Sequence, residues 1–166
     1  MIPIVTPAEM AAIDAAAPVP VAALVERAGA AVARTAVDLL GGTYGRRVAI
    51  IAGKGNNGAD GRAAATWLER RGARCVVLDP DIATLPIEVD LVIDAAYGTG
   101  LSRPYDFPAV PDGVPVLAVD IPSGVDGLTG ARLGSPPAAD RTVTFAALKP
   151  GLLLEPGREL AGGVVV

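Results

Sequence analysis

The sequence of 166 residues has no histidine, a single cysteine and very few aromatic residues. Without histidine, any acid–base chemistry must use Asp, Glu, Lys, Tyr or water, and metal sites built on histidine are excluded. The one cysteine, Cys75, lies in an apolar run and is predicted to be a buried strand residue. Because it cannot form a disulfide within the chain, it favours a reducing compartment.

Long apolar runs and an excess of positive charge are missing as well. No uncharged apolar run approaches the length that crosses a bilayer, so no membrane partner is expected. The formal net charge is −4 and the basic residues do not cluster, which argues against a nucleic-acid partner. The segment Met1–Pro7 lacks the basic and apolar regions of a signal peptide. Together with the single cysteine, this predicts a cytoplasmic location.

The hydrophobic fraction of 51% against 19% charged residues is typical of one globular domain, here spanning residues 1–166. Helical patterns cover residues 7–16, 20–40 and 62–71, and Thr6 and Glu9 form a capping box for the first. Predicted strands cover residues 47–52, 74–79, 89–94, 115–120, 141–147 and 162–166. Helices alternating with continuous apolar strands predict an α/β fold with an open, mostly parallel sheet.

The stretch Gly53–Gly61, with the sequence GKGNNGADG, follows the first predicted strand and precedes a helical pattern. This order builds phosphate-binding turns, because glycine allows close approach and the free amides of a helix start attract anions. The G-x-G-x-x-G spacing also matches a dinucleotide fingerprint, which the strand and helix on either side strengthen. Asn56 and Asn57 add side-chain amides. Asp60 adds a carboxylate, predicted to lie in the first helical turn.

Polar residues also follow the later predicted strands. Parallel strands present their carboxyl ends along one edge of the sheet, and ligands bind in the crevice outside that edge. The residues expected there are Asn56, Asn57, Asp60, Asp94, Gly98, Gly100, Asp120, Ser123, Gly124 and Lys149. A carboxylate such as Asp94 or Asp120, directly at the end of an apolar strand, needs a lysine, a cation or a substrate hydroxyl as its partner.

Four motifs in order along the chain are GKGNNGADG at 53–61, DAAYGTG at 94–100, VDIPSGVDG at 119–127 and LKPG at 148–151. They resemble the NAD(P)H-hydrate epimerase family of YjeF N-terminal domains, and the resemblance covers nearly the whole chain. It implies a Rossmann-like three-layer αβα sandwich with two N-terminal helices. It further implies that the chain interconverts the R and S forms of hydrated NADH and NADPH. The implied partner is an ADP- or ATP-dependent dehydratase of the same pathway, often fused to the epimerase in bacteria.

The resemblance also implies a set of site residues. Substrate would be bound by Asn56, Asn57, Gly58, Ala59, Asp60, Gly98, Thr99, Gly100, Leu101, Ser102, Arg103, Pro104 and Asp120. A potassium ion would be held by Asn57, Asp94 and Ser123, whose oxygens suit a large monovalent cation. For the chemistry, the hypothesis is that Asp120 is the acid–base group, with Lys149 tuning its charge or holding a phosphate.

The sequence departs from the family mainly in length. Ala59 replaces a common glycine, which is a small change. The segments 79–90 and 100–115 are short, whereas a parallel crossover usually needs about a dozen residues or more, often including a helix. Two covering elements are therefore expected to be missing. Either one face of the sheet is thinly covered, or another subunit covers it, and a bare face predicts association into a homo-oligomer.

Two other functions compete with the epimerase reading. An NAD-dependent dehydrogenase would use Asp79, at the end of the second strand, to bind the ribose, but no substrate domain follows in the sequence. A non-catalytic nucleotide- or protein-binding module of the same fold is the second alternative. The presence of Asn57, Asp94, Asp120 and Ser123 argues against an inactive site.

Overall fold

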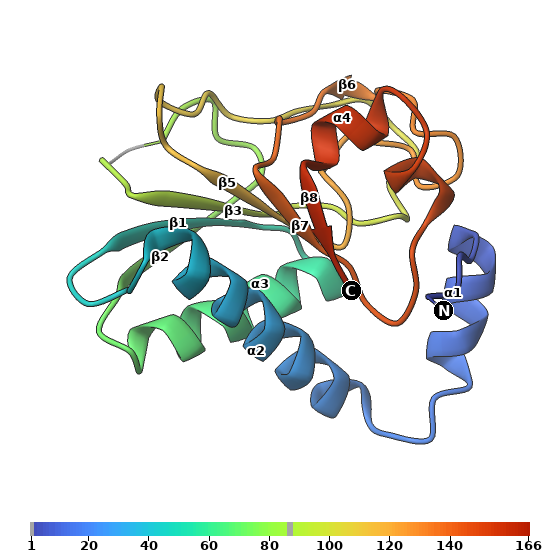
Figure 1. The fold of residues 1–166 in the computed structure, drawn as a ribbon, viewed down its shortest axis with the longest axis horizontal. Helices are drawn as coiled ribbons and strands as arrows, with labels where there is room; N and C mark the ends of the chain where they lie inside the picture. The colour runs from blue at the N-terminus through green and yellow to red at the C-terminus, as the bar shows by residue number, and fades with distance from the viewer. Residues whose placement is uncertain (1, 86–87) are drawn as a thin grey trace.

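A parallel sheet of six strands, in the order β2-β1-β3-β5-β7-β8, runs through the computed structural model, which describes residues 2–85 and 88–166 (Figure 1). The strands are β1 (Arg47–Ala52), β2 (Arg74–Leu78), β3 (Leu91–Ala95), β5 (Val116–Val119), β7 (Arg141–Val143) and β8 (Gly163–Val165). The chain leaves β1 toward β2 and then returns to the other side of β1 as β3. The strand order therefore reverses between β1 and β3, where ligands of such sheets bind.

Two long helices cover one face of the sheet, α2 (Val21–Leu40) and α3 (Asn56–Glu69), while α1 (Pro7–Ala15) lies apart from them (Figure 1). The two pack closely because Gly29 of α2 has no Cβ, which would overlap Ala63 of α3. Beneath them the apolar side chains of β1 and its neighbours are fully buried. Trp67 of α3 packs against this core, with the guanidinium groups of Arg70 and Arg71 each 5.5 Å from its ring.

The opposite face carries a thinner layer. It holds η1 (Pro150–Leu152), α4 (Gly157–Ala161) and a small sheet of β4 (Tyr105–Asp106) and β6 (Gly134–Ser135). Neither shortened crossover contains a helix in its described part, as expected from the sequence; Pro86 and Ile87 lie outside the described residues. Of the two alternatives, the face is thinly covered by this chain rather than left bare. Ile51 and Val92 are completely buried there, beneath Tyr105 and the surrounding loop residues.

Most elements begin and end within two residues of the sequence prediction, and the differences have local causes. The strand expected over 141–147 ends at Val143, because Ala146 adopts a positive φ of 61° and the chain turns there. The helix expected from residue 62 begins at Asn56, so Asp60 lies in its second turn rather than its first. Cys75 is half-buried rather than fully buried.

The N-terminal segment is tied to the body of the protein near the end of the chain. Leu148 donates its N–H to Pro3 O at 2.9 Å and accepts the N–H of Val5 at the same distance. The capping box at Thr6 and Glu9 then opens α1 as predicted. None of the helices in the described part of the chain combines the length and apolar character that crossing a bilayer requires.

Candidate functional site

A cleft of about 760 Å³ lies at the carboxyl ends of the strands. Its walls come from α1 and the first turns of α2, from the start of α3, from the loop after β3, and from the chain that follows β5 and β7. Its lining includes Met10, Asp14, Arg27, Asn56, Asn57, Asp60, Tyr97, Gly98, Arg103, Asp120 and Lys149. Segments far apart in the sequence thus meet at one edge of the sheet, as the motif order predicted.

The turn between β1 and α3 depends on glycines, which bring its backbone close to neighbouring backbone. A Cβ at Gly53 would overlap the carbonyl oxygen of Ala96, and one at Gly58 would overlap the carbonyl oxygen of Gly53. Gly55 is the N-cap of α3 and offers no side chain to bind the first amides, so these remain available to a ligand. Arg62 fixes the turn from behind by donating to Gly53 O at 2.8 Å.

The carboxylate of Asp94, at the end of β3, is completely buried and bound by hydrogen bonds alone. Its Oδ1 accepts the hydroxyl of Ser123 at 2.5 Å, and its Oδ2 accepts the N–H of Ser123 at 2.7 Å. Burial raises the pKa of Asp94 to about 6, and the bonds from Ser123 oppose that rise. The Ser123 hydroxyl oxygen also accepts the N–H of Tyr97 at 2.9 Å, and it lies within donating distance, 2.9 Å, of the Tyr97 carbonyl oxygen. This network joins the two loops beside the cleft.

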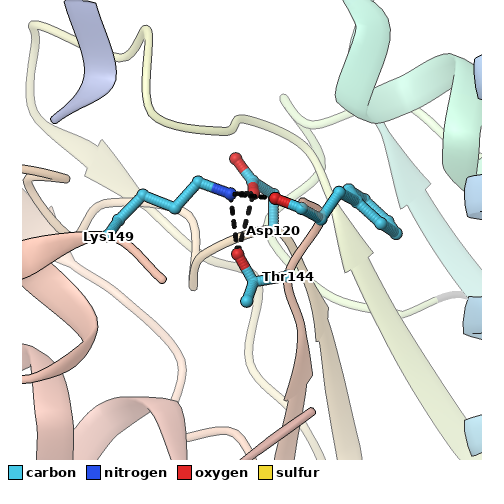
Figure 2. A network of polar contacts seen from close by, with 4 residues as sticks. Asp120, Thr144 and Lys149 are labelled. Atoms are coloured by element: carbon cyan, nitrogen blue, oxygen red, sulfur yellow. Dashed lines mark hydrogen bonds and ion pairs between the residues drawn. The ribbon is translucent and has the colours of Figure 1, made fainter. Parts of the chain in front are cut away.

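The carboxylate after β5 has a different surrounding. Figure 2 shows Asp120 facing Lys149 and Thr144. Lys149 is 1% exposed and donates to Asp120 Oδ1 at 2.5 Å, to Thr144 Oγ1 at 2.8 Å and to the carbonyl of Phe145 at 3.1 Å. Its three N–H donors are therefore all in use, which favours the role of tuning Asp120 over that of holding a phosphate. Thr144 also donates to Asp120 Oδ1, at 3.1 Å.

The second oxygen of Asp120 is left for the cleft. A Cβ placed on Gly98 would stand 3.4 Å from Asp120 Oδ2 and 3.5 Å from Asn57 Cγ, so these two side chains and the Gly98 backbone converge. Asp120 holds this position with a positive φ of 66°, a backbone region that aspartate and asparagine tolerate better than most residues. Such a conformation at the mouth of a cleft is typical of functional positions.

Asn57 and Asp60 of α3 line the cleft and have side-chain atoms without a partner in the described structure, as does Trp67 Nε1 away from the cleft. The Nδ2 atom of Asn57 is buried without a hydrogen-bond acceptor. Asp60 is 8% exposed and makes no ion pair with a described residue. Burial, and after it the charges of Asp120 and Asp14, raise the pKa of Asp60 to about 7. Buried polar groups are normally satisfied, so unpaired ones lining a cleft indicate a place for a ligand.

The structure brings most of the predicted site residues together, but in two layers. The cleft wall contains Asn56, Asn57, Asp60, Gly98, Thr99, Gly100, Leu101, Ser102, Arg103, Asp120 and Lys149. Asp94 and Ser123 lie buried behind that wall, Gly58 packs under the turn, and Ala59, Pro104 and Gly124 do not line the cleft. Asp79 is exposed and accepts the N–H of Asp81 at 3.1 Å, which is the role of a turn residue.

Sequence reasoning missed several residues of the site. Thr144 links Lys149 to Asp120, and Met10, Asp14 and Arg27 bring the two N-terminal helices into the cleft wall. Thr144 directly follows β7, which is a signal only once the end of that strand is known. The helix residues gave no signal, because an exposed acid or arginine on an amphipathic helix normally faces solvent.

The donors near Asp94 can be tested against the potassium ion that the resemblance implies. Within residues 2–85 and 88–166, no group of three or more Asp, Glu or Cys side chains forms a metal site. The oxygens of Asp94, Ser123 and Tyr97 do gather within hydrogen-bond distance. The unpaired atom of Asn57 is the donor Nδ2, so Asn57 could bind a cation only through its Oδ1 atom. An amide, a hydroxyl, a main-chain carbonyl and one carboxylate suit a monovalent cation, so the donor set fits.

These features define a Rossmann-like α/β protein with a ligand cleft at the switch point of its sheet. The profile of the family described as YjeF-related protein N-terminus matches residues 21–86 and 78–151, and the chain belongs to that family. The fold alone is shared with the crystal structure of the yeast protein ynu0, YNL200c, with a TM-score of 0.72 at 22% identity, over 89% of this chain and 82% of the yeast chain.

Two relatives show how the chain compares in length. It is 39% identical over 183 residues to a bifunctional NAD(P)H-hydrate repair enzyme Nnr from Thermofilum pendens, covering 86% of this chain and 34% of the relative. It is 34% identical over 180 residues to an NAD(P)H-hydrate epimerase from Limosilactobacillus fermentum, covering 89% and 86%. The chain thus spans about a third of the bifunctional relative and most of the single-function one.

Proposed function

We propose that the protein interconverts the R and S epimers of hydrated NADH and NADPH. The observation that carries this proposal is the position of Asp120: one oxygen is held by Lys149 and Thr144, and the other faces the cleft beside Gly98 and Asn57. A carboxylate so fixed offers one free oxygen as an acid–base group. Relatives named for NAD(P)H-hydrate epimerisation and repair support the same activity.

The chemistry requires a hydroxyl group to leave one face of a ring carbon and return on the other. An acid protonates the hydroxyl, the carbon–oxygen bond breaks, and water departs with the electron pair. Water then adds to the opposite face and gives a proton back to a base, so nothing is oxidised or reduced. Asp120 takes part in this proton exchange, and the buried ammonium of Lys149 stabilises its charge without leaving its own three partners.

The remaining cleft residues suit a dinucleotide. Gly55, Asn56 and Asn57 begin α3, so a phosphate at this helix start would meet free amides. Arg103 supplies a cation at the loop after β3, where its guanidinium lies 5.1 Å from the Tyr97 ring and donates to the Tyr97 hydroxyl at 2.8 Å. The apolar part of the wall includes Met10 of α1.

Potassium is part of the proposal, with Asn57, Asp94 and Ser123 as its ligands. When bound, the cation would neutralise Asp94 near the place where the diphosphate approaches. Conversion of the substrate is expected to need potassium and to fall when sodium or a bulky organic cation replaces it. Because activity alone can respond to salt, the unfolding temperature should also rise with potassium chloride in the natural protein and not in Ser123→Ala. If potassium, sodium and the organic cation changed the unfolding temperature equally, in the natural protein and in Ser123→Ala alike, the potassium site would be refuted.

The activity is tested by mixing the protein with one purified epimer of hydrated NADH and following the composition by chromatography. The expected result is an approach to the epimer mixture faster than the spontaneous reaction. A rate equal to that without protein would refute the proposal. Binding of the substrate without conversion would instead favour the non-catalytic module.

Three further statements stay predictions. An ADP- or ATP-dependent dehydratase would consume the product, either as a separate protein or as a fused domain. The fusion is supported by the bifunctional names of relatives such as those from Mycobacterium tuberculosis, 41% identical over 136 residues, covering 66% of this chain and 29% of the relative. Association into a homo-oligomer was predicted from a bare sheet face, and that face is covered by the chain itself. Light scattering would test the association. A cytoplasmic location is untested.

A further inference from the structure

Asp60 is a buried acidic side chain in the cleft wall that the proposed reaction has not yet used. It lies in the second turn of α3, 8% of its surface is exposed, and it forms no ion pair with a described residue. Its open side faces the cleft. A carboxyl group buried without a partner is unfavourable as an anion, so it lowers the stability of the folded protein. Its presence in the cleft wall therefore suggests a function.

The charges around Asp60 favour its protonated form. Asp14 faces it from α1 and Asp120 from the end of β5, and both charges act with burial to raise the pKa of Asp60 to about 7. Cations also line the cleft, but Lys149 is bound to Asp120 and Arg103 to Tyr97. Arg27 of α2 faces the same cleft without being among the groups that act on the pKa of Asp60.

Most other titratable groups of the site have partners. Both oxygens of Asp94 are filled by Ser123, and the three N–H donors of Lys149 are filled by Asp120, Thr144 and Phe145. Asp120 accepts from two donors on one oxygen and has the other open to the cleft, while Asp14 of the cleft wall is exposed to solvent. Asp60 is left as the buried carboxyl group of the cleft wall that has no partner among the described residues and can give a proton.

We propose that Asp60 is a second catalytic residue, which donates a proton to the departing hydroxyl while Asp120 accepts a proton from the water that adds on the opposite face. This inference rests on the proposed epimerase function. Two acids with environments that separate their roles are a recurring arrangement in enzymes. They also suit an epimerase, which must serve both faces of one carbon.

The step balances with one proton shared between the two carboxyl groups. Asp60 loses its proton to the hydroxyl oxygen, the carbon–oxygen bond breaks, and the ring nitrogen lends its electron pair to the carbon as water leaves. Incoming water forms the new carbon–oxygen bond, and its proton goes to Asp120. The resulting state, with Asp60 ionised and Asp120 protonated, is the starting state for the reverse reaction. Exchange with solvent restores the first state.

The test compares the natural protein with Asp60→Asn, Asp60→Glu and the control Asp38→Asn, an exposed position on α2. Each is given a single epimer of hydrated NADH between pH 5 and 9. In the natural protein, conversion should fall as pH rises through about 7, where Asp60 loses its proton. Asp60→Asn should be slower by about 100-fold or more below pH 7 and should lack this fall. Asp60→Glu should recover part of both, and Asp38→Asn should match the natural protein.

A second readout does not depend on activity. Carbon-13 NMR of labelled aspartate carboxyl groups should show one resonance that titrates near pH 7, disappears in Asp60→Asn and titrates at lower pH in Asp14→Asn. An ordinary titration of Asp60, or an active Asp60→Asn with the natural pH profile, would overturn this inference and leave the epimerase proposal standing. A natural protein without conversion would refute the epimerase proposal itself, and this inference with it.

Discussion

Two neighbouring strands of the sheet each carry a carboxylate at their ends, and the two ends satisfy that charge differently. Near the end of β3, Asp94 is fully buried, and both of its oxygens are occupied by Ser123. After β5, Asp120 receives a lysine and a threonine on one oxygen and keeps the other toward the cleft. The first arrangement joins two loops, and the second leaves an atom able to react. The same residue type near the ends of two parallel strands thus joins loops in one place and, under the proposed function, would exchange protons in the other.

The largest effect that would separate the two ends is the loss of the Asp120 carboxylate. Asp120→Asn keeps the side-chain size and tolerates the positive φ of 66°, so the fold should remain. Epimer exchange should fall by about 100-fold or more, toward the spontaneous rate, because the acid–base group is gone. Chromatography of the epimers measures the loss, and circular dichroism checks the fold. Unchanged exchange would remove Asp120 from the mechanism.

The next effect concerns the buried lysine that marks the β5 end. Lys149→Met removes the ammonium and leaves Asp120 without its cation, which should lower the free energy of unfolding by about 3 kcal/mol, the lower end of what breaking a buried pair costs. Denaturant unfolding measures this. Lys54→Met, at an exposed lysine, is the matched control. The double variant with Lys149→Met and Asp120→Asn tests whether the two groups interact. If it loses as much stability as the sum of the two single variants, the two groups do not act as a pair.

A third carboxylate sharpens the comparison because it has neither kind of partner. The native pKa of Asp60 is about 7 against an ordinary value of 3.8, so the native state holds this proton more tightly than the unfolded chain. Stability from this group is therefore present below about pH 4 and lost as pH rises to about 7, by up to about 4 kcal/mol. Asp60→Asn should be more stable than the natural protein at pH 8, by about 2 kcal/mol or more, and nearly equal at pH 4. Thermal unfolding at both values tests this; equal stability at pH 8 would contradict it.

The smallest expected effect is at the β3 end. Ser123→Ala removes the hydroxyl that Asp94 and Tyr97 share, which should lower the free energy of unfolding by about 1–3 kcal/mol. The loss of stability should be present without potassium as well as with it. Conversion should fall less than in Asp120→Asn, because Asn57 and Asp94 remain as proposed potassium ligands. Ser135→Ala, at an exposed serine of β6, provides the control. A loss of activity as large as that of Asp120→Asn would show that the two strand ends do not differ in role.

The fold was predictable where one signal dominates. The strand over 47–52 begins at Arg47, is apolar from there on and is followed by Gly53, and the structure places β1 at those residues. The start of α3 was not predictable, because asparagine and glycine at 56–58 are poor helix formers. The helix begins there because Gly58 packs under the turn and Gly61 packs against Ala95 of β3, contacts that only the folded chain supplies.

The covering of the second face also escaped prediction. The sequence showed that two helices were missing, but not that Tyr105 would pack edge-on against Tyr97 and Phe107 and close the sheet. For the site, the strand-end rule gathered Asp120, Asn57 and Gly98 correctly in one cleft. It could not separate the exposed wall from the layer of Asp94 and Ser123 behind it, because burial depends on how the loop at Tyr97 folds over them.

The packing of Trp67 has a practical consequence. This is the chain's one tryptophan, and it lies in the fourth turn of α3 against the core beneath the two long helices, beyond the residues that line the cleft. Its intrinsic fluorescence is therefore a natural optical probe of whether the helical layer is intact. The same emission should stay almost silent when a nucleotide enters, so ligand titrations need a different signal, such as heat or a fluorescent analogue.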